Sequence, residues 1–63
     1  MEVYIERTNK KLNLEANNVE DLLKKLKINP TTVIVSANDE LVTEDYKLNK
    51  KDKVKIMSVI SGG

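Results

Sequence analysis

The feature that most constrains this 63-residue chain is one helical pattern set among strand patterns. Apolar residues at positions i, i+3, i+4 and i+7 are Val19, Leu22, Leu23 and Leu26. This spacing predicts an amphipathic helix of about ten residues with one apolar face. Because the chain offers no second helix to cover that face, we expect a β-sheet to cover it.

Polar residues suited to both helix ends flank this apolar pattern. Asn17 at the N-cap would place Glu20 at the third helical position, which is a variant of the capping box. Glu20 and Asp21 lie in the first turn and lysines follow in the last, which matches the helix dipole. Pro30 disfavours helical backbone at Asn29, so we expect the helix to stop there.

Apolar residues outside the helix alternate with polar ones or are β-branched, which predicts strands. The predicted strands are residues 1–6, the stretch around Leu12 and Leu14, residues 33–35, residues 40–42 and residues 54–60. Asn38-Asp39 is suited to the tight turn between the third and fourth of them. The last strand is apolar on both faces near its end, which is typical of a central strand.

The predicted order is strand, strand, helix, strand, short strand, strand. A hairpin followed by a crossover helix allows a later strand to lie parallel to the first. We therefore expect an α+β protein of the β-grasp (ubiquitin-like) architecture over residues 1–60. It would have a mixed four- to five-stranded sheet with one helix packed on one face. The other face would stay partly open, where apolar side chains are unusual for a monomer.

The composition excludes several classes of site. Cysteine and histidine are absent, which removes disulfides, zinc sites and histidine or thiol catalysis. No apolar stretch has the length of a membrane span or the form of a secretion signal. We therefore expect a cytoplasmic protein with no membrane contact and with neither a metal nor a cofactor of its own.

Lysines are concentrated between residues 47 and 55, with Asp52 as the one acidic residue there. A solvated turn and strand edge is one interpretation, and a docking surface for a protein or RNA is the other. The net charge is only +1, whereas nucleic-acid-binding domains are usually more basic. Single strands stack on aromatic side chains, of which only Tyr4 and Tyr46 are present, so a nucleic-acid partner is not expected.

The chain ends in Ile60-Ser61-Gly62-Gly63, which contains its only two glycines. Glycine suits backbone that must enter a narrow space, and three extended residues reach ~10 Å. We expect residues 61–63 to form a flexible tail whose carboxylate is threaded into another protein. A frayed terminus without a function is the alternative.

Three segments resemble the ThiS/MoaD family of ubiquitin-like sulfur carriers, most closely the ThiS type. They are residues 19–26, residues 33–42, and residues 52–56 continuing to 59–63. Tyr46 stands where this family often has an aromatic residue. The chain departs from the family at Lys27 and Lys51, where glycine is common, and at Thr43, where proline is common.

The resemblance implies chemistry at the tail. A ubiquitin-activating-type adenylyltransferase would consume ATP to adenylate Gly63, and a sulfur donor enzyme would convert the adenylate into a thiocarboxylate. Gly62 and Ser61 would thread the tail into these partners. A sulfur-accepting synthase would then take the sulfur, first for the thiazole of thiamin, with molybdopterin or tRNA thiolation as alternatives. The chain would be a cosubstrate and not an enzyme.

Strand parity gives four candidate partner-binding residues, which are Met57, Val59, Ile60 and Ile34. If Val54 and Ile56 face the helix, Met57 and Val59 lie on the open face. Ile34 joins them if its neighbours face inward, and Ile60 leads into the tail. Core packing is the alternative for each of the four.

The alternative function is that of a ubiquitin-like protein modifier. The same activated Gly-Gly end would then form an isopeptide bond with a lysine of another protein. The activation step is common to both functions, so the sequence leaves both open.

Overall fold

The computed structural model describes residues 1–59, so Ile60 and the predicted tail at residues 61–63 lie outside the described residues. The elements in chain order are β1 (Glu2–Ile5), the 3₁₀ turn η1 (Glu6–Thr8), β2 (Lys10–Asn13), α1 (Val19–Lys25), the 3₁₀ turn η2 (Pro30–Thr32), β3 (Val33–Ala37), β4 (Glu40–Val42) and β5 (Lys53–Ser58).

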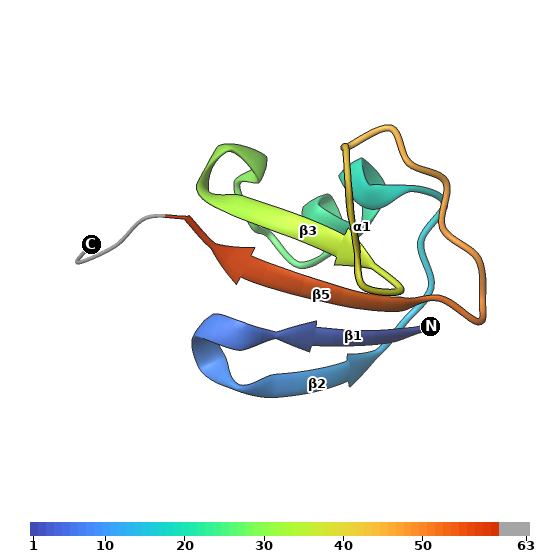
Figure 1. Ribbon diagram of the computed structural model, residues 1–63, viewed down its shortest axis with the longest axis horizontal. Helices are drawn as coiled ribbons and strands as arrows, with labels where there is room; N and C mark the ends of the chain where they lie inside the picture. The colour runs from blue at the N-terminus through green and yellow to red at the C-terminus, as the bar shows by residue number, and fades with distance from the viewer. Residues whose placement is uncertain (60–63) are drawn as a thin grey trace.

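The strands form one five-stranded sheet in the order β2-β1-β5-β3-β4. The central strand β5 pairs parallel with β1 and antiparallel with β3. Two antiparallel hairpins, β1–β2 and β3–β4, complete the sheet. The helix α1 packs on one side of this mixed sheet (Figure 1). The predicted β-grasp architecture is therefore confirmed.

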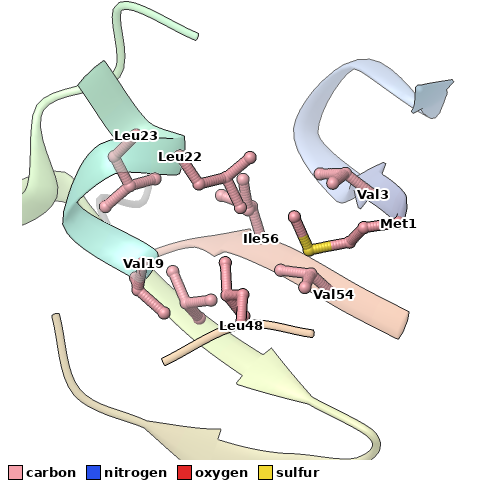
Figure 2. Packing of buried hydrophobic residues seen from close by; sticks show 9 residues of the cluster. Met1, Val3, Val19, Leu22, Leu23, Leu48, Val54 and Ile56 are labelled. Atoms are coloured by element: carbon pink, nitrogen blue, oxygen red, sulfur yellow. The ribbon is translucent and has the colours of Figure 1, made fainter. Parts of the chain in front are cut away.

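The core lies between α1 and the sheet. Figure 2 shows Leu22 and Leu23 of α1 directed toward the sheet, from which Ile56 and Val3 face them. Burial of each such side chain favours folding by about 1.5–3 kcal/mol. The buried cluster consists of Met1, Val3, Val19, Leu22, Leu23, Val35, Leu48, Val54 and Ile56.

The helix begins one residue later than predicted. Asn18, and not Asn17, is the N-cap, and its Oδ1 accepts the N–H of Asp21 at 2.7 Å. Asp21 in turn accepts the Asn17 N–H at 3.1 Å through its Oδ2. The prediction was wrong because either asparagine places an acidic residue three positions later, Glu20 for Asn17 and Asp21 for Asn18.

The loop between β4 and β5 caps the remaining N–H groups at the start of α1. The Val19 N–H donates to the Tyr46 carbonyl at 3.1 Å, and the Glu20 N–H donates to the Glu44 carbonyl at 2.9 Å. Leu48 of the same loop is buried in the core, and Tyr46 is half-buried against it. Tyr46 and Leu48 thus anchor this loop to the core.

The helix also ends earlier than predicted, at Lys25, and has seven residues. Lys27 adopts a φ of 58°, in the left-handed region, and the Ile28 N–H donates back to the Leu23 carbonyl at 2.9 Å. These are the features of a Schellman motif, which closes a helix without proline. Pro30 instead begins the turn η2.

Replacing Lys27 by glycine is expected to stabilise the protein. The left-handed conformation costs a non-glycine residue about 1–2 kcal/mol, whereas glycine costs about 0.5–1 kcal/mol in chain entropy. We expect the free energy of unfolding, measured in urea, to rise by up to about 1 kcal/mol. Lys24→Gly within α1 is the matched control and should lower it by about 1 kcal/mol. Equal destabilisation by both substitutions would contradict this account of the helix end.

Asn38 and Asp39 form the predicted turn between β3 and β4. Their φ angles are 53° and 68°, and a type I′ hairpin turn requires positive φ at both central residues. The turn sets Ser36 directly opposite Leu41 in the ladder. The position of the turn thus determines which face of the sheet each β4 side chain occupies.

The buried Asp52 ties this turn to the start of β5. Its carboxylate accepts the Asn49 N–H at 2.9 Å and the Asn38 side-chain amide at 3.0 Å. The Asn38 Oδ1 accepts the Lys53 N–H at 3.1 Å. The bond from the Asn49 N–H, followed by that from the Asn38 amide, lowers the pKa of Asp52 because both favour the charged carboxylate.

The lowered pKa of Asp52 predicts a loss of stability in acid. Its contribution is fully present above the unfolded-state pKa of about 3.9 and is lost as the pH falls through the lower folded-state value. We expect Asp52→Asn to be less stable than the wild type in urea denaturation at about pH 7. The difference should shrink toward about pH 2. A difference that is independent of pH would show that Asp52 contributes by packing alone.

Candidate functional site

The open face of the sheet, opposite α1, carries the candidate site. Val35 lies opposite Ile56 in the β3–β5 ladder, and both are buried under the helix. Side chains alternate between the faces of a strand, so the next pair, Ile34 and Met57, lies on the open face. The Val59 N–H donates to the Thr32 carbonyl at 3.0 Å and continues this pairing beyond Ser58.

Apolar side chains on this face remain accessible to a partner. Within residues 1–59, the exposed large apolar side chains are Ile34, Leu41 and Val59, with exposed fractions of 42%, 71% and 47%. Met57 is half-buried. We call Ile34, Leu41, Met57 and Val59 the apolar sheet surface. A few apolar anchors within a polar rim are typical of a protein-binding site.

The structure places Ile34 and Met57 on the open face, as strand parity predicts, and leaves Val59 exposed. Their role in partner binding stays a prediction. Ile60, the fourth predicted contact residue, lies outside the described residues, as do Ser61, Gly62 and Gly63 of the predicted tail.

Sequence reasoning missed Leu41. Val42 is half-buried against the core, so its neighbour Leu41 faces outward, beside Ser36 on the open face. The Asn38-Asp39 turn contained the signal for this placement, because a two-residue hairpin turn sets the register of the strands it joins. With Ser36 opposite Leu41, the most exposed apolar side chain joins the same face as Ile34.

The β1–β2 side of the open face is charged. The Lys55 ammonium lies 3.3 Å from the Glu6 carboxylate, and the Lys11 ammonium lies 4.0 Å from that of Glu2. The Tyr4 hydroxyl donates to Asn9 Oδ1 at 2.7 Å. Exposed ion pairs of this kind contribute little to stability. Here they compensate the charge around Tyr4, so this side provides a polar border to the apolar sheet surface.

The lysines of residues 47–55 do not all border the same depression. Lys53 and Lys55 border a depression on the open face together with Tyr4. Lys50 borders a different depression, with Glu15 and Lys25 among its other lining residues. The division of the lysines between two depressions favours the interpretation as a solvated turn and strand.

Residues 1–59 contain no group of three acidic side chains that could hold a metal ion. They contain no helix of the length and apolar character that crossing a membrane requires.

The sheet order, the single helix and the apolar sheet surface define a ubiquitin-like β-grasp protein. Residues 2–63 match the model of the ThiS family, and the chain belongs to this family. It is also similar to "Sulfur carrier protein TtuB" of Thermus thermophilus. The two are 35% identical over 43 residues, which is 68% of this chain and 66% of that protein. The match thus spans just under two thirds of the relative's length.

Proposed function

We propose that this chain is a sulfur carrier whose Gly63 carboxylate is converted into a thiocarboxylate. The observation that carries the proposal is the Gly62-Gly63 end that follows the central strand β5 in a member of the ThiS family. The name of the Thermus relative, a sulfur carrier protein, supports the same function. The chain would act as a cosubstrate of its partner enzymes and not as an enzyme.

The proposed chemistry begins with activation, because a carboxylate is ionised at neutral pH and is a poor electrophile. One Gly63 carboxylate oxygen attacks the α-phosphate of ATP in the adenylyltransferase, and pyrophosphate leaves. The outer sulfur of a donor persulfide then attacks the acyl carbon and displaces AMP. A second thiolate forms a disulfide with the donor and releases the thiocarboxylate. We place the thiazole of thiamin first among the acceptors because the resemblance is closest to the ThiS type.

The described residues supply docking and positioning in this proposal. The apolar sheet surface would dock against the adenylyltransferase through Leu41 and Ile34, with the charged β1–β2 side as its polar rim. Val59, directly after β5, is held to Thr32 by a backbone hydrogen bond. Ile34 of the docked surface therefore lies on β3, which is directly bonded to β5, the strand that precedes the Gly-Gly end in the sequence.

Gly62→Val tests the proposed threading of the tail. A side chain at this position would have to pass a channel shaped for backbone, so we expect loss of ATP–pyrophosphate exchange with the cognate adenylyltransferase. Lys51→Val, at an exposed loop residue, is the control and should retain exchange. The free energy of unfolding should be unchanged in both variants. Exchange at the wild-type rate by Gly62→Val would refute the threading. One extra residue after Gly63 should also abolish thiocarboxylation.

Leu41→Ser and Ile34→Ser test the docking surface. Because both side chains are exposed, the free energy of unfolding should change by no more than about 0.5 kcal/mol. Loss of a central apolar anchor should raise the KM for the carrier in pyrophosphate exchange roughly fivefold or more, with kcat retained. Glu40→Ser, next to Leu41 but on the other face, is the matched control. An unchanged KM in both Leu41→Ser and Ile34→Ser would show that this surface does not dock against the adenylyltransferase.

A further inference from the structure

A third depression, which has an apolar floor, lies at the end of the sheet where β5 finishes. Figure 1 shows the β1–β2 turn, the η2 turn and the end of β5 together at this end of the molecule. The depression has a volume of about 500 Å³, and its floor includes Ile5, Leu12, Leu26 and Ile28. These residues connect β1 and β2 with the C-terminal end of α1, so we call it the β2–α1 groove.

The floor of the groove remains accessible although it packs against the core. The four floor residues are half-buried, whereas core residues such as Leu22 and Ile56 are almost completely buried. Volumes in this range are typical of pockets that bind small-molecule ligands. The groove can therefore receive apolar side chains without displacing any part of the core.

The rim of the groove is positively charged. Arg7 and Lys10 both line it and are exposed, and neither forms an ion pair within residues 1–59. Among its described lining residues none is acidic. Elsewhere on the surface, lysines such as Lys24 and Lys55 lie beside carboxylates. An apolar floor under an uncompensated positive rim complements a segment that has both apolar and acidic side chains.

The strand that forms one wall of the groove is open to pairing. In the described part of the chain β2 pairs with β1 alone and is an edge of the sheet. An extended peptide can add to such an edge through backbone hydrogen bonds. Leu12 faces the groove, and Val3 opposite it is buried in the core. A strand added beside Leu12 would direct every second side chain to the groove side of the sheet.

We propose that the β2–α1 groove binds an extended segment of a partner protein, with aliphatic side chains at alternate positions and Asp or Glu on either side. The aliphatic side chains fill the groove, and the carboxylates meet Arg7 and Lys10. Two segments of this chain have a comparable composition, which are β1 with Glu6 after it and β4. β1 already pairs with both β2 and β5, and β4 has only three residues and already pairs with β3. A separate protein therefore fits the groove better than a second copy does.

The position of the groove gives this binding site a use distinct from the apolar sheet surface. Thr32 and Ser58 line the groove, and Thr32 also accepts the Val59 N–H, so the bound segment lies beside the end of β5. The apolar sheet surface is on the opposite face of the sheet. Two partners can thus hold the chain at the same time. The inference goes beyond the proposed sulfur transfer, and its test needs none of the sulfur-transfer enzymes.

The test is a titration of the ¹⁵N-labelled chain with the peptide acetyl-Glu-Asp-Val-Leu-Val-Asp-Glu-amide, followed by NMR. We expect amide shift changes in β2 and in the groove floor at millimolar peptide, together with slower hydrogen exchange of β2 amides. A peptide with lysine in place of each acidic residue should not bind. Absence of shift changes, equal binding of the lysine peptide, or changes on the apolar sheet surface would each overturn the proposal.

Charge variants provide the second arm of the test. Arg7→Gln combined with Lys10→Gln should raise the dissociation constant of the acidic peptide roughly fivefold, as expected for two exposed charge pairs. Lys50→Gln combined with Lys51→Gln removes the same charge elsewhere and should leave binding unchanged. Equal weakening by both pairs would indicate non-specific attraction and overturn the proposal. If the β2 amide shifts depend on protein concentration in the absence of peptide, the groove binds a second copy of this chain. That result would overturn the proposal of a separate partner protein.

Discussion

The pairing of β5 with strands on both sides is the constraint on which the rest of the structure depends. Backbone bonds to β1 and β3 fix its register twice, so Val54 and Ile56 face α1 and build the core. The alternate residues Lys55 and Met57 then lie on the open face. A shift of one residue would exchange the two sets and lose the core, which is why this register is strongly specified. The alternation of side chains along β5 therefore produces both the core on one face and part of the apolar sheet surface on the other.

Contacts at both ends of β5 support this arrangement. At its start, Asp52 and Asn38 join the β3–β4 turn to Lys53 through side-chain hydrogen bonds. At its far end, the Val59 N–H bonds to Thr32. The strand that leads toward the Gly-Gly end is thus held to its neighbours along its described length. Under the proposed function, this ordered strand would reduce the conformational freedom that the chain loses on binding its partner enzymes.

Periodicity was sufficient to predict the helix, the strands and their β-grasp arrangement, and it placed Met57 on the face opposite to Val54 and Ile56. It failed where several residues fit one rule, as with the choice between Asn17 and Asn18 for the helix cap. It also failed at Lys27, because lysine carries no signal for left-handed backbone. The apolar sheet surface was predicted except for Leu41, which lies in a strand of only three residues. The β2–α1 groove was not predicted, since residues distant in sequence form it.

The intact mass of the protein isolated from its own cells tests the central claim most directly. A thiocarboxylate at Gly63 predicts a fraction of molecules that are heavier by the difference between one sulfur and one oxygen atom. Alkylation with iodoacetamide should shift that fraction further, because a thiocarboxylate is a stronger nucleophile than a carboxylate. Only the unmodified mass, together with lysines of other proteins that carry residues 56–63 after trypsin cleavage at Lys55, would contradict the sulfur carrier and establish a protein modifier instead.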